Sequence, residues 1–139
     1  MPPEFEWVYP GTLARSCRPG YHDETPSVAK LGRWMNQVSR LGIRSILCLL
    51  SEPELWQNYG FNGLDLLACY RSHGFQVGHV PLPDEVEPTL CPRDFLQIRI
   101  TLSQLAAPYL IHCSAGIDRT GAVIEFIRSR PSLVKHRQG

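Results

Sequence analysis

The sequence predicts a single α/β domain built on a central, largely parallel β-sheet that is flanked by helices. Short apolar runs alternate with stretches whose apolar residues recur every three or four positions, a pattern typical of strands that alternate with helices. The chain has 139 residues, of which 43% are hydrophobic, so it is long enough for one buried core and too short for two ordinary domains. Proline and glycine are spread along the chain rather than gathered into a linker. We therefore expect residues 1–139 to form one domain.

The first half of the chain predicts a hairpin, a helix, a buried strand and the start of a second helix. Residues 7–16, WVYPGTLARS, have the pattern of a hairpin at the edge of a sheet. Apolar residues at helical spacing predict a helix over 27–41, followed by a glycine. The apolar run SILCLL at 45–50 predicts a strand that is buried on both faces. A capping-box pattern from Ser51 to Glu54, with a proline in the first turn, predicts that a helix begins there.

The second half predicts two further strands and two further helices. β-Branched and aromatic residues predict a strand over 75–82, which leads into the proline-rich acidic loop PLPDEVEP at 81–88. Apolar residues repeat on one helical face over 92–107 and predict a helix that a proline stops. The segment YLIHC at 109–113 predicts the last core strand, and residues 120–130 predict the closing helix. A loop between this strand and this helix is therefore expected.

Charge and hydropathy exclude several classes of protein. The 14 basic and 13 acidic residues give a net charge of +1, which lacks the basic excess of a general nucleic-acid or membrane-surface binder. No apolar run approaches the roughly 18 to 20 residues of a membrane span, and the first residues have neither the basic nor the apolar region of a secretory signal. We expect a cytoplasmic protein with no membrane span and no nucleic-acid partner. The composition leaves the oligomeric state open.

The spacing of the 5 cysteines argues against a disulfide framework and against a metal site. Their number is odd, they are widely spaced, and no CxxC pair or histidine-rich stretch accompanies them. The missing CxxC also disfavours a thiol-redox protein. We expect most of them to be small buried hydrophobic residues, and we expect no metal and no cofactor. The five are Cys17, Cys48, Cys69, Cys91 and Cys113.

One of these cysteines lies in a ten-residue segment with a specific pattern. The segment HCSAGIDRTG, from His112 to Gly121, joins the last predicted strand to the last predicted helix. A tight loop that enters a helix directs several backbone N–H groups into one concavity, and the positive end of the helix adds to their field. Such a nest binds a phosphate group and favours the thiolate form of Cys113, while the planar guanidinium of Arg119 matches two phosphoryl oxygens. The pattern predicts phosphoryl transfer to a cysteine, without a metal.

The segment has the form His-Cys-(x)5-Arg-Thr and resembles the catalytic loop of the cysteine-dependent protein tyrosine phosphatase superfamily, above all its compact dual-specificity branch. The resemblance implies a phosphocysteine intermediate on Cys113, a phosphoryl group bound by Arg119, and a Thr120 hydroxyl that donates to the leaving thiolate. It also implies that His112 orients and tunes Cys113, although a packed strand histidine would explain the same residue. The loop residues that would bind substrate are Ser114, Ala115, Gly116, Ile117, Asp118 and Arg119.

The position of the loop narrows this resemblance. Low-molecular-weight phosphatases and arsenate reductases carry a similar loop near the amino terminus, whereas here it begins at residue 112 of 139. The rhodanese-like branch lacks the HCSAGxxRTG form. The resemblance therefore implies a dual-specificity phosphatase-like catalytic domain over residues 1–139. Because the chain ends soon after the last predicted helix, it fits either a minimal domain or a trimmed carboxyl end.

A phosphoryl transfer of this kind also needs an acid outside the loop. The leaving oxygen takes up a proton, and a base then activates water, so one carboxyl group can perform both tasks in turn. Asp84 in the proline-rich loop is the candidate, because the resemblance places a general-acid aspartate on a loop about thirty residues before the cysteine. Glu85 and Glu87 are alternatives, and Asp84 could instead be a simple turn residue.

Three further residues receive conditional roles. The segment LARSCRPG resembles an Arg-Ser motif near the active-site mouth of small atypical members, which implies substrate binding by Arg15; a surface arginine on an edge strand is the alternative. The resemblance places Cys48 on the strand beside the catalytic strand, where it could form an oxidation-protecting disulfide with Cys113, or be a buried hydrophobic residue. An acid at Asp118 would repel substrate, so we expect its carboxylate to point out of the pocket.

Together these features predict a phosphatase that hydrolyses phosphate monoesters through a phosphocysteine intermediate. The predicted substrate is phosphotyrosine in a protein, with phosphoserine and phosphothreonine also accepted. A phosphoinositide or other small phosphate ester is the first alternative, since Asp-Arg-Thr also occurs in phosphoinositide phosphatases, but the lysines of such loops are replaced here by Ala115 and Ile117. The second alternative is a catalytically silent pseudophosphatase that only binds phosphate.

Overall fold

The computed structural model describes residues 5–22, 25–84 and 90–134 and has an α/β architecture. Its sheet has five strands in the order β1-β2-β5-β3-β4. The strands are β1 (Glu6–Tyr9), β2 (Leu13–Ser16), β3 (Ser45–Cys48), β4 (Gln76–His79) and β5 (Tyr109–His112). The helices are α1 (Val28–Arg40), α2 (Glu52–Asn58), α3 (Leu66–Ser72), α4 (Pro92–Gln104) and α5 (Asp118–Ser129), with 3-10 turns η1 (Gly60–Asn62) and η2 (Pro131–Leu133).

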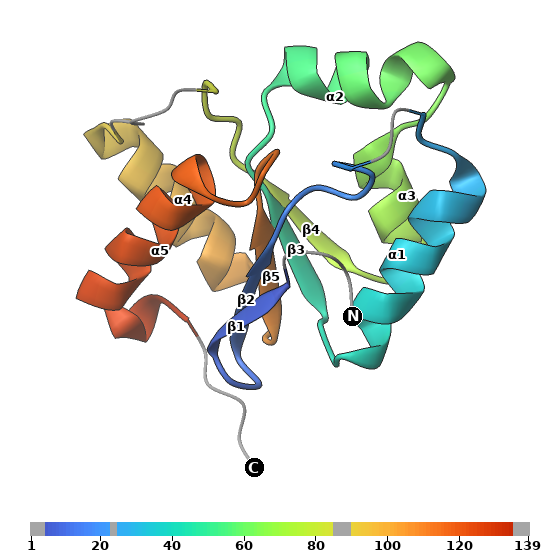
Figure 1. Cartoon of the computed structure of the whole chain (residues 1–139). Helices are drawn as coiled ribbons and strands as arrows, with labels where there is room; N and C mark the ends of the chain where they lie inside the picture. Colours follow the sequence, from blue (N-terminus) through green and yellow to red (C-terminus); the bar gives the residue numbers. More distant parts are fainter. Residues whose placement is uncertain (1–4, 23–24, 85–89, 135–139) are drawn as a thin grey trace.

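The sheet is parallel except at one edge, as the sequence predicts. Strands β2, β5, β3 and β4 pair in parallel, and only β1 pairs antiparallel with β2, which is the predicted amino-terminal hairpin. Helices α4 and α5 cover one face of the sheet, and α1 and α3 cover the other (Figure 1). Helix α2 lies beyond the carboxyl ends of the parallel strands. Loops at the carboxyl ends of such strands are the usual place of a ligand site in α/β folds.

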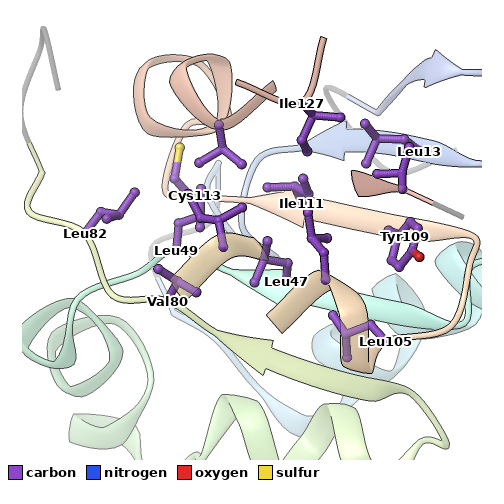
Figure 2. Close-up of a cluster of buried hydrophobic side chains, with 14 residues drawn as sticks. Leu13, Leu47, Leu49, Val80, Leu82, Leu105, Tyr109, Ile111, Cys113 and Ile127 are labelled. Atoms are coloured by element: carbon purple, nitrogen blue, oxygen red, sulfur yellow. The ribbon is translucent and has the colours of Figure 1, made fainter. Parts of the chain in front are cut away.

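Two apolar cores hold these layers together. On the α4/α5 face, Leu47, Ile111 and Tyr109 belong to a buried cluster that also includes residues of both helices (Figure 2). On the other face, β3 and β5 contribute Ile46 and Leu110 to a second buried cluster with α1 and α3. Alternate residues of the central strands therefore face opposite cores. Because both faces of β3 are buried, the segment SILCLL is apolar without alternation.

The boundaries of three predicted elements differ from the structure. The helix predicted to about residue 107 ends at Gln104, because Leu105 already has extended backbone angles of φ −102° and ψ 152°. The closing helix begins at Asp118 rather than after the arginine, so Arg119 lies in its first turn. The strand predicted over 75–82 is paired only over 76–79, although Leu82 still donates to the carbonyl of Leu49 at 3.1 Å.

Helix α3 was not predicted. It has only seven residues, and Leu66 and Tyr70 are its buried positions, so its periodicity is too short to recognise. Its first turn is fixed by Asp65, whose side chain accepts a hydrogen bond from the N–H of Ala68 at 3.1 Å. Among the described helices, none is long and apolar enough to cross a membrane.

Candidate active site

The predicted phosphate-binding loop connects the end of β5 to the start of α5. Gly116 in this loop has a φ of +79°, a conformation that side chains other than glycine rarely adopt. A Cβ atom at this position would lie 2.2 Å from the carbonyl oxygen of Ser16, which is far inside contact distance. The backbone N–H of Arg18 donates to the carbonyl of Ser114 at 2.8 Å. The loop is therefore pressed against the segment that follows β2, and only glycine fits at its turn.

Cys113 lies at the bottom of a small cavity formed by this loop. The cavity has a volume of about 220 Å³, and Cys113 is 3% exposed. Figure 2 shows Cys113 at one end of the α4/α5-side core. The residues that line the cavity are Tyr21, Asp84, Cys113, Ser114, Ala115, Asp118 and Arg119. The cavity thus brings together six of the residues that the sequence singles out, namely Asp84, Cys113, Ser114, Ala115, Asp118 and Arg119.

The remaining loop residues occupy other positions. Gly116 is buried behind the cavity, and Ile117 is 63% exposed on the surface. Neither belongs to the cavity lining, so any contact with substrate would come from their backbone groups. Asp118 is exposed and is among the lining residues, and the expected orientation of its carboxylate out of the pocket stays a prediction. As the first residue of α5, it also complements the positive end of the helix.

Arg119 is held by the carboxylate of Glu54, a residue whose sequence pattern predicts only a helix cap. Its guanidinium is 1% exposed, and its Nη1 and Nη2 atoms donate to Oε1 and Oε2 of Glu54 at 2.5 and 2.8 Å. Nη1 also donates to the carbonyl of Leu82 at 3.1 Å. Burial alone would lower the pKa of Arg119, but the hydrogen bonds and the charge of Glu54 outweigh it and raise this pKa. The guanidinium is therefore charged and fixed before any ligand binds.

The geometry of this pairing leaves one edge of Arg119 for an anion. Glu54 occupies the end of the guanidinium, formed by Nη1 and Nη2. The side edge is formed by Nε and Nη2, and Oδ1 of Asp84 lies 3.3 Å from its Nη2 atom. Within the described part of the chain, Nε has no hydrogen-bond partner. A planar guanidinium can grip two oxygens of one phosphoryl group through such an edge. Arg119 can thus bind Glu54 and a phosphoryl group at the same time.

Asp84 reaches the same cavity from the loop after β4. Its Oδ1 atom lies 3.3 Å from Nη2 of Arg119, and its side chain is 68% exposed. The general-acid role that the sequence predicts for Asp84 stays a prediction. The alternatives Glu85 and Glu87 lie outside the described residues.

His112 lies directly before Cys113 and is completely buried. Its Nδ1 lies 2.9 Å from the carbonyl oxygen of Cys113, and its Nε2 lies 2.9 Å from the hydroxyl of Tyr70. A carbonyl can only accept, so Nδ1 carries the proton and Nε2 accepts from the Tyr70 hydroxyl. Burial lowers the pKa of His112 to about 4, so the ring is neutral at physiological pH. The imidazole therefore fixes the backbone of the nucleophile rather than supplying charge.

Thr120 and Cys48 are both buried near the loop. The Thr120 hydroxyl has no hydrogen-bond partner within residues 5–22, 25–84 and 90–134. Cys48 is the register partner of His112 in the β3–β5 pairing, and burial raises its thiol pKa to about 12. Its side chain packs in the α1/α3-side core, whereas Cys113 packs in the core on the opposite face. A disulfide between the two remains a prediction.

Two arginines of the segment around residues 15–18 support the loop from outside. Arg15 Nη2 donates to the carbonyl oxygens of Gly116 and Ile117 at 2.7 and 3.3 Å. Arg15 is absent from the cavity lining, so its predicted role in substrate binding stays a prediction. Arg18, which the sequence analysis did not single out, donates from Nε to the Ser114 hydroxyl at 3.2 Å.

Among the described residues, no group of three or more His, Cys, Asp or Glu side chains is arranged to hold a metal ion. The arrangement offers a buried cysteine in the loop before α5, a guanidinium held by Glu54 and an exposed carboxyl group beside that guanidinium.

Comparison with known proteins finds similar phosphatases. No protein-family model matches the chain. The rice protein inositol diphosphatase DSP1 (Oryza sativa subsp. japonica) is 32% identical over 94 residues, which amount to 66% of this chain and 39% of the rice protein. The chain thus spans about two fifths of the length of this curated relative. The core catalytic domain of the PP-IP phosphatase SIW14 from S. cerevisiae matches 93% of this chain and 68% of its own, with a TM-score of 0.61 and 26% identity.

The chain belongs to the cysteine-dependent protein tyrosine phosphatase superfamily. Tk-PTP in its active form shares the superfamily fold with a TM-score of 0.61, at 22% identity over 94% of this chain and 77% of that one. Membership of the superfamily and the single α/β domain confirm the sequence-based expectations. This member of the superfamily has Ser114, Ala115 and Ile117 in its loop, so the only cation that the loop contributes to the cavity is Arg119.

Proposed function

We propose that residues 1–139 form a dual-specificity phosphatase-like catalytic domain that hydrolyses phosphate monoesters through a phosphocysteine intermediate. The observation that carries this proposal is the convergence of Cys113, Arg119 and Asp84 on one cavity of about 220 Å³. These residues come from the loop after β5, from α5 and from the loop after β4, and their side chains match the three tasks of the reaction. A nucleophile, an anion clamp and a proton donor are sufficient for this chemistry.

In the first step, the thiolate of Cys113 attacks the phosphorus atom in line with the ester oxygen. The P–O bond to the leaving alcohol breaks, and the protonated carboxyl group of Asp84 gives its proton to that oxygen. Loop N–H groups and the Nε/Nη2 edge of Arg119 bind the three equatorial oxygens, where charge is concentrated in the transition state. The products of this step are a free alcohol and a phosphorylated Cys113.

In the second step, the carboxylate of Asp84 takes a proton from a water molecule that attacks the phosphorus atom. The S–P bond breaks, inorganic phosphate leaves, and the sulfur atom departs as a thiolate. The buried hydroxyl of Thr120, which has no hydrogen-bond partner in the described part of the chain, would donate a hydrogen bond to this thiolate. The enzyme returns to its starting state with no net change in protonation.

A small phosphate ester is the substrate class best supported. The rice and yeast relatives are an inositol diphosphatase and a PP-IP phosphatase by their names, and together they carry the highest sequence identities among the relatives described above. Phosphotyrosine in a protein, which the sequence predicts, is therefore the second candidate. The substrate panel in the following experiment separates the two.

The test is steady-state release of phosphate without added metal from an inositol pyrophosphate, phosphotyrosine and phosphothreonine peptides, and a phosphoinositide. We expect Cys113→Ser to abolish turnover and Asp84→Asn to lower kcat by about 10²-fold or more. Cys91→Ser and Glu125→Gln make the same chemical changes at exposed positions outside the cavity and should leave turnover intact. Turnover that persists in Cys113→Ser would overturn the proposal. Binding of vanadate without turnover on any substrate would support the pseudophosphatase instead.

A further inference from the structure

A second cavity lies beside the catalytic cavity and is lined by basic side chains. Its volume is about 190 Å³, and Arg18, His22, Lys30 and Arg33 are among its lining residues. We propose that this cavity binds a second phosphate group of the substrate, so that the protein selects small molecules that carry two or more phosphates. This inference rests on the proposed function and specifies its substrate class.

The two cavities are neighbours that share part of one wall. Tyr21 lines both of them. Arg18 lines the basic cavity, and its Nε atom donates to the hydroxyl of Ser114, which lines the catalytic cavity, at 3.2 Å. The Arg18 guanidinium also lies 5.6 Å from the centre of the Tyr21 ring and 5.8 Å from that of Tyr59, so both aromatic rings attract it. When a substrate binds with its reacting phosphate at Cys113, the Arg18 cation therefore lies in the neighbouring wall of the basic cavity.

Charge distinguishes the two cavities. The catalytic cavity has one cation, Arg119, which is already paired with Glu54, and two acids, Asp84 and Asp118. Among the described residues that line the basic cavity there is no carboxylate. Asp23 and Glu24, which follow His22 in the sequence, lie outside the described residues. Further phosphate groups, each doubly charged near neutral pH, are repelled by Asp84 and Asp118 of the catalytic cavity and attracted by the guanidinium groups of Arg18 and Arg33 in the basic cavity.

The basic side chains come from two elements that the fold brings together. Arg18 and His22 lie on the segment after β2, which runs from the carboxyl end of the sheet toward the start of α1 (Figure 1). Lys30 and Arg33 are three residues apart and so lie on one face of α1. The Lys30 ammonium donates to the carbonyl of Thr25 at 2.9 Å. The buried ring of Trp34 forms part of the apolar wall beneath these cations.

Binding to the Cys113→Ser protein tests this site without relying on turnover. The probes are myo-inositol hexakisphosphate and myo-inositol 1-phosphate, measured by titration calorimetry at fixed salt concentration. We expect the hexakisphosphate to bind at least tenfold more tightly than the monophosphate, and the double change Lys30→Gln/Arg33→Gln to remove most of this difference. The matched control Arg40→Gln/Arg128→Gln removes two exposed arginines at the ends of α1 and α5 and should keep the difference.

The outcomes separate this inference from the proposed function. Equal affinities of the two probes, or an equal loss in the Lys30/Arg33 and control proteins, would overturn the second phosphate site. If the Lys30→Gln/Arg33→Gln change weakened binding of a doubly phosphorylated peptide but not of the hexakisphosphate, the second phosphate site would be overturned in favour of a protein substrate. If the wild-type protein releases no phosphate while the selective binding holds, the proposed function fails and the second site stands.

Discussion

Glu54 forms a two-point pairing with Arg119, with N–O distances of 2.5 and 2.8 Å, across a sequence separation of 65 residues. The same Oε1 atom accepts from the backbone N–H of Ser51 at 2.9 Å, so one carboxylate both caps α2 and fixes the phosphate-binding arginine. Hydrogen bonds from Arg119 and Ser51 lower the pKa of Glu54 against the opposing effect of burial. The Glu54–Arg119 ion pair therefore connects the first turn of α2 to the first turn of α5.

Replacement of Glu54 tests this connection. We expect Glu54→Gln to lower the free energy of unfolding by about 2 kcal/mol, because a buried cation loses one charged acceptor. We expect kcat/KM to fall by about tenfold to a hundredfold, because Arg119 is no longer held in register with the loop. Urea denaturation and phosphate release measure the two effects. The matched control is Glu52→Gln on the same helix, where the carboxylate is 78% exposed and lies 3.8 Å from His79. Equal effects of the two substitutions would contradict this role of Glu54.

Gly116 supports a second prediction, on the shape of the loop. We expect Gly116→Ala to abolish turnover and to destabilise the protein, because the new Cβ would lie 2.2 Å from the carbonyl of Ser16 and the backbone has a φ of +79°. Gly63→Ala is the matched control, since Gly63 has a φ of +76° and nothing within 4 Å of the same added atom. The control should cost only the conformational strain, about 1–2 kcal/mol. Thermal unfolding and kinetics of both variants give the comparison, and similar behaviour would show that contact with Ser16 is unimportant.

His112 predicts a dependence of stability on pH. Its pKa is about 4 in the folded protein against 6.5 for an ordinary histidine, so the unfolded chain binds more protons between these values. Stability from this residue is therefore complete above pH 6.5 and is lost as the pH falls toward 4. We expect a loss of about 2 kcal/mol between pH 7.5 and pH 5. Urea denaturation at both pH values measures it, and His73→Gln, at an exposed position, should preserve the loss.

An NMR titration of the His112 ring checks the same prediction directly. The ring should stay neutral down to about pH 5, with the proton on Nδ1. A midpoint above pH 6 would refute the argument from burial. Tyr70→Phe removes the donor to Nε2, so the buried ring nitrogen would lose its partner and stability should fall by about 1–3 kcal/mol.

The sequence predicts well those elements that depend on residues close to one another in the chain. The helix over 27–41, the buried strand at 45–50 and the loop from His112 to Gly121 follow from periodicity, apolar runs and a specific motif. Within the described residues, these features appear as α1, β3 and the loop between β5 and α5. The carboxylate of Asp84 was placed near the loop by family resemblance, and the structure brings it to 3.3 Å from Arg119.

The supporting residues could not be predicted, because their partners are distant in sequence. The capping-box pattern alone explains a glutamate at position 54. The sequence therefore does not indicate that Glu54 also pairs with Arg119. Tyr70 lies 42 residues before His112 on a short helix that the sequence did not reveal. Arg18 reads as an ordinary polar residue of a loop until the fold places it against Ser114. Such contacts follow from the topology of the sheet, which the sequence constrains only at the level of fold class.

The predicted disulfide between Cys48 and Cys113 leads to the last prediction. Both thiols are free, and a sulfenic acid formed on Cys113 by peroxide would be attacked by the thiolate of Cys48; the S–O bond breaks and hydroxide leaves, to be protonated by solvent. Burial raises the pKa of Cys48 to about 12, so at neutral pH only about one molecule in 10⁵ carries this thiolate. The rate of crosslinking should therefore rise about tenfold per pH unit between pH 7 and pH 9, at the expense of sulfinic acid.

Peptide mass spectrometry after brief peroxide treatment measures both products at each pH. The Cys48→Ser protein should give sulfinic acid on Cys113 at all pH values, and Cys69→Ser, outside both the catalytic loop and β3, should behave as the wild type. A crosslink that forms equally fast at pH 7 and pH 9 would mean that Cys48 leaves its buried position before it reacts. The absence of a crosslink at both values would mean that Cys48 acts only as a packed residue in the α1/α3-side core, and that the catalytic thiol has no internal protection from this strand.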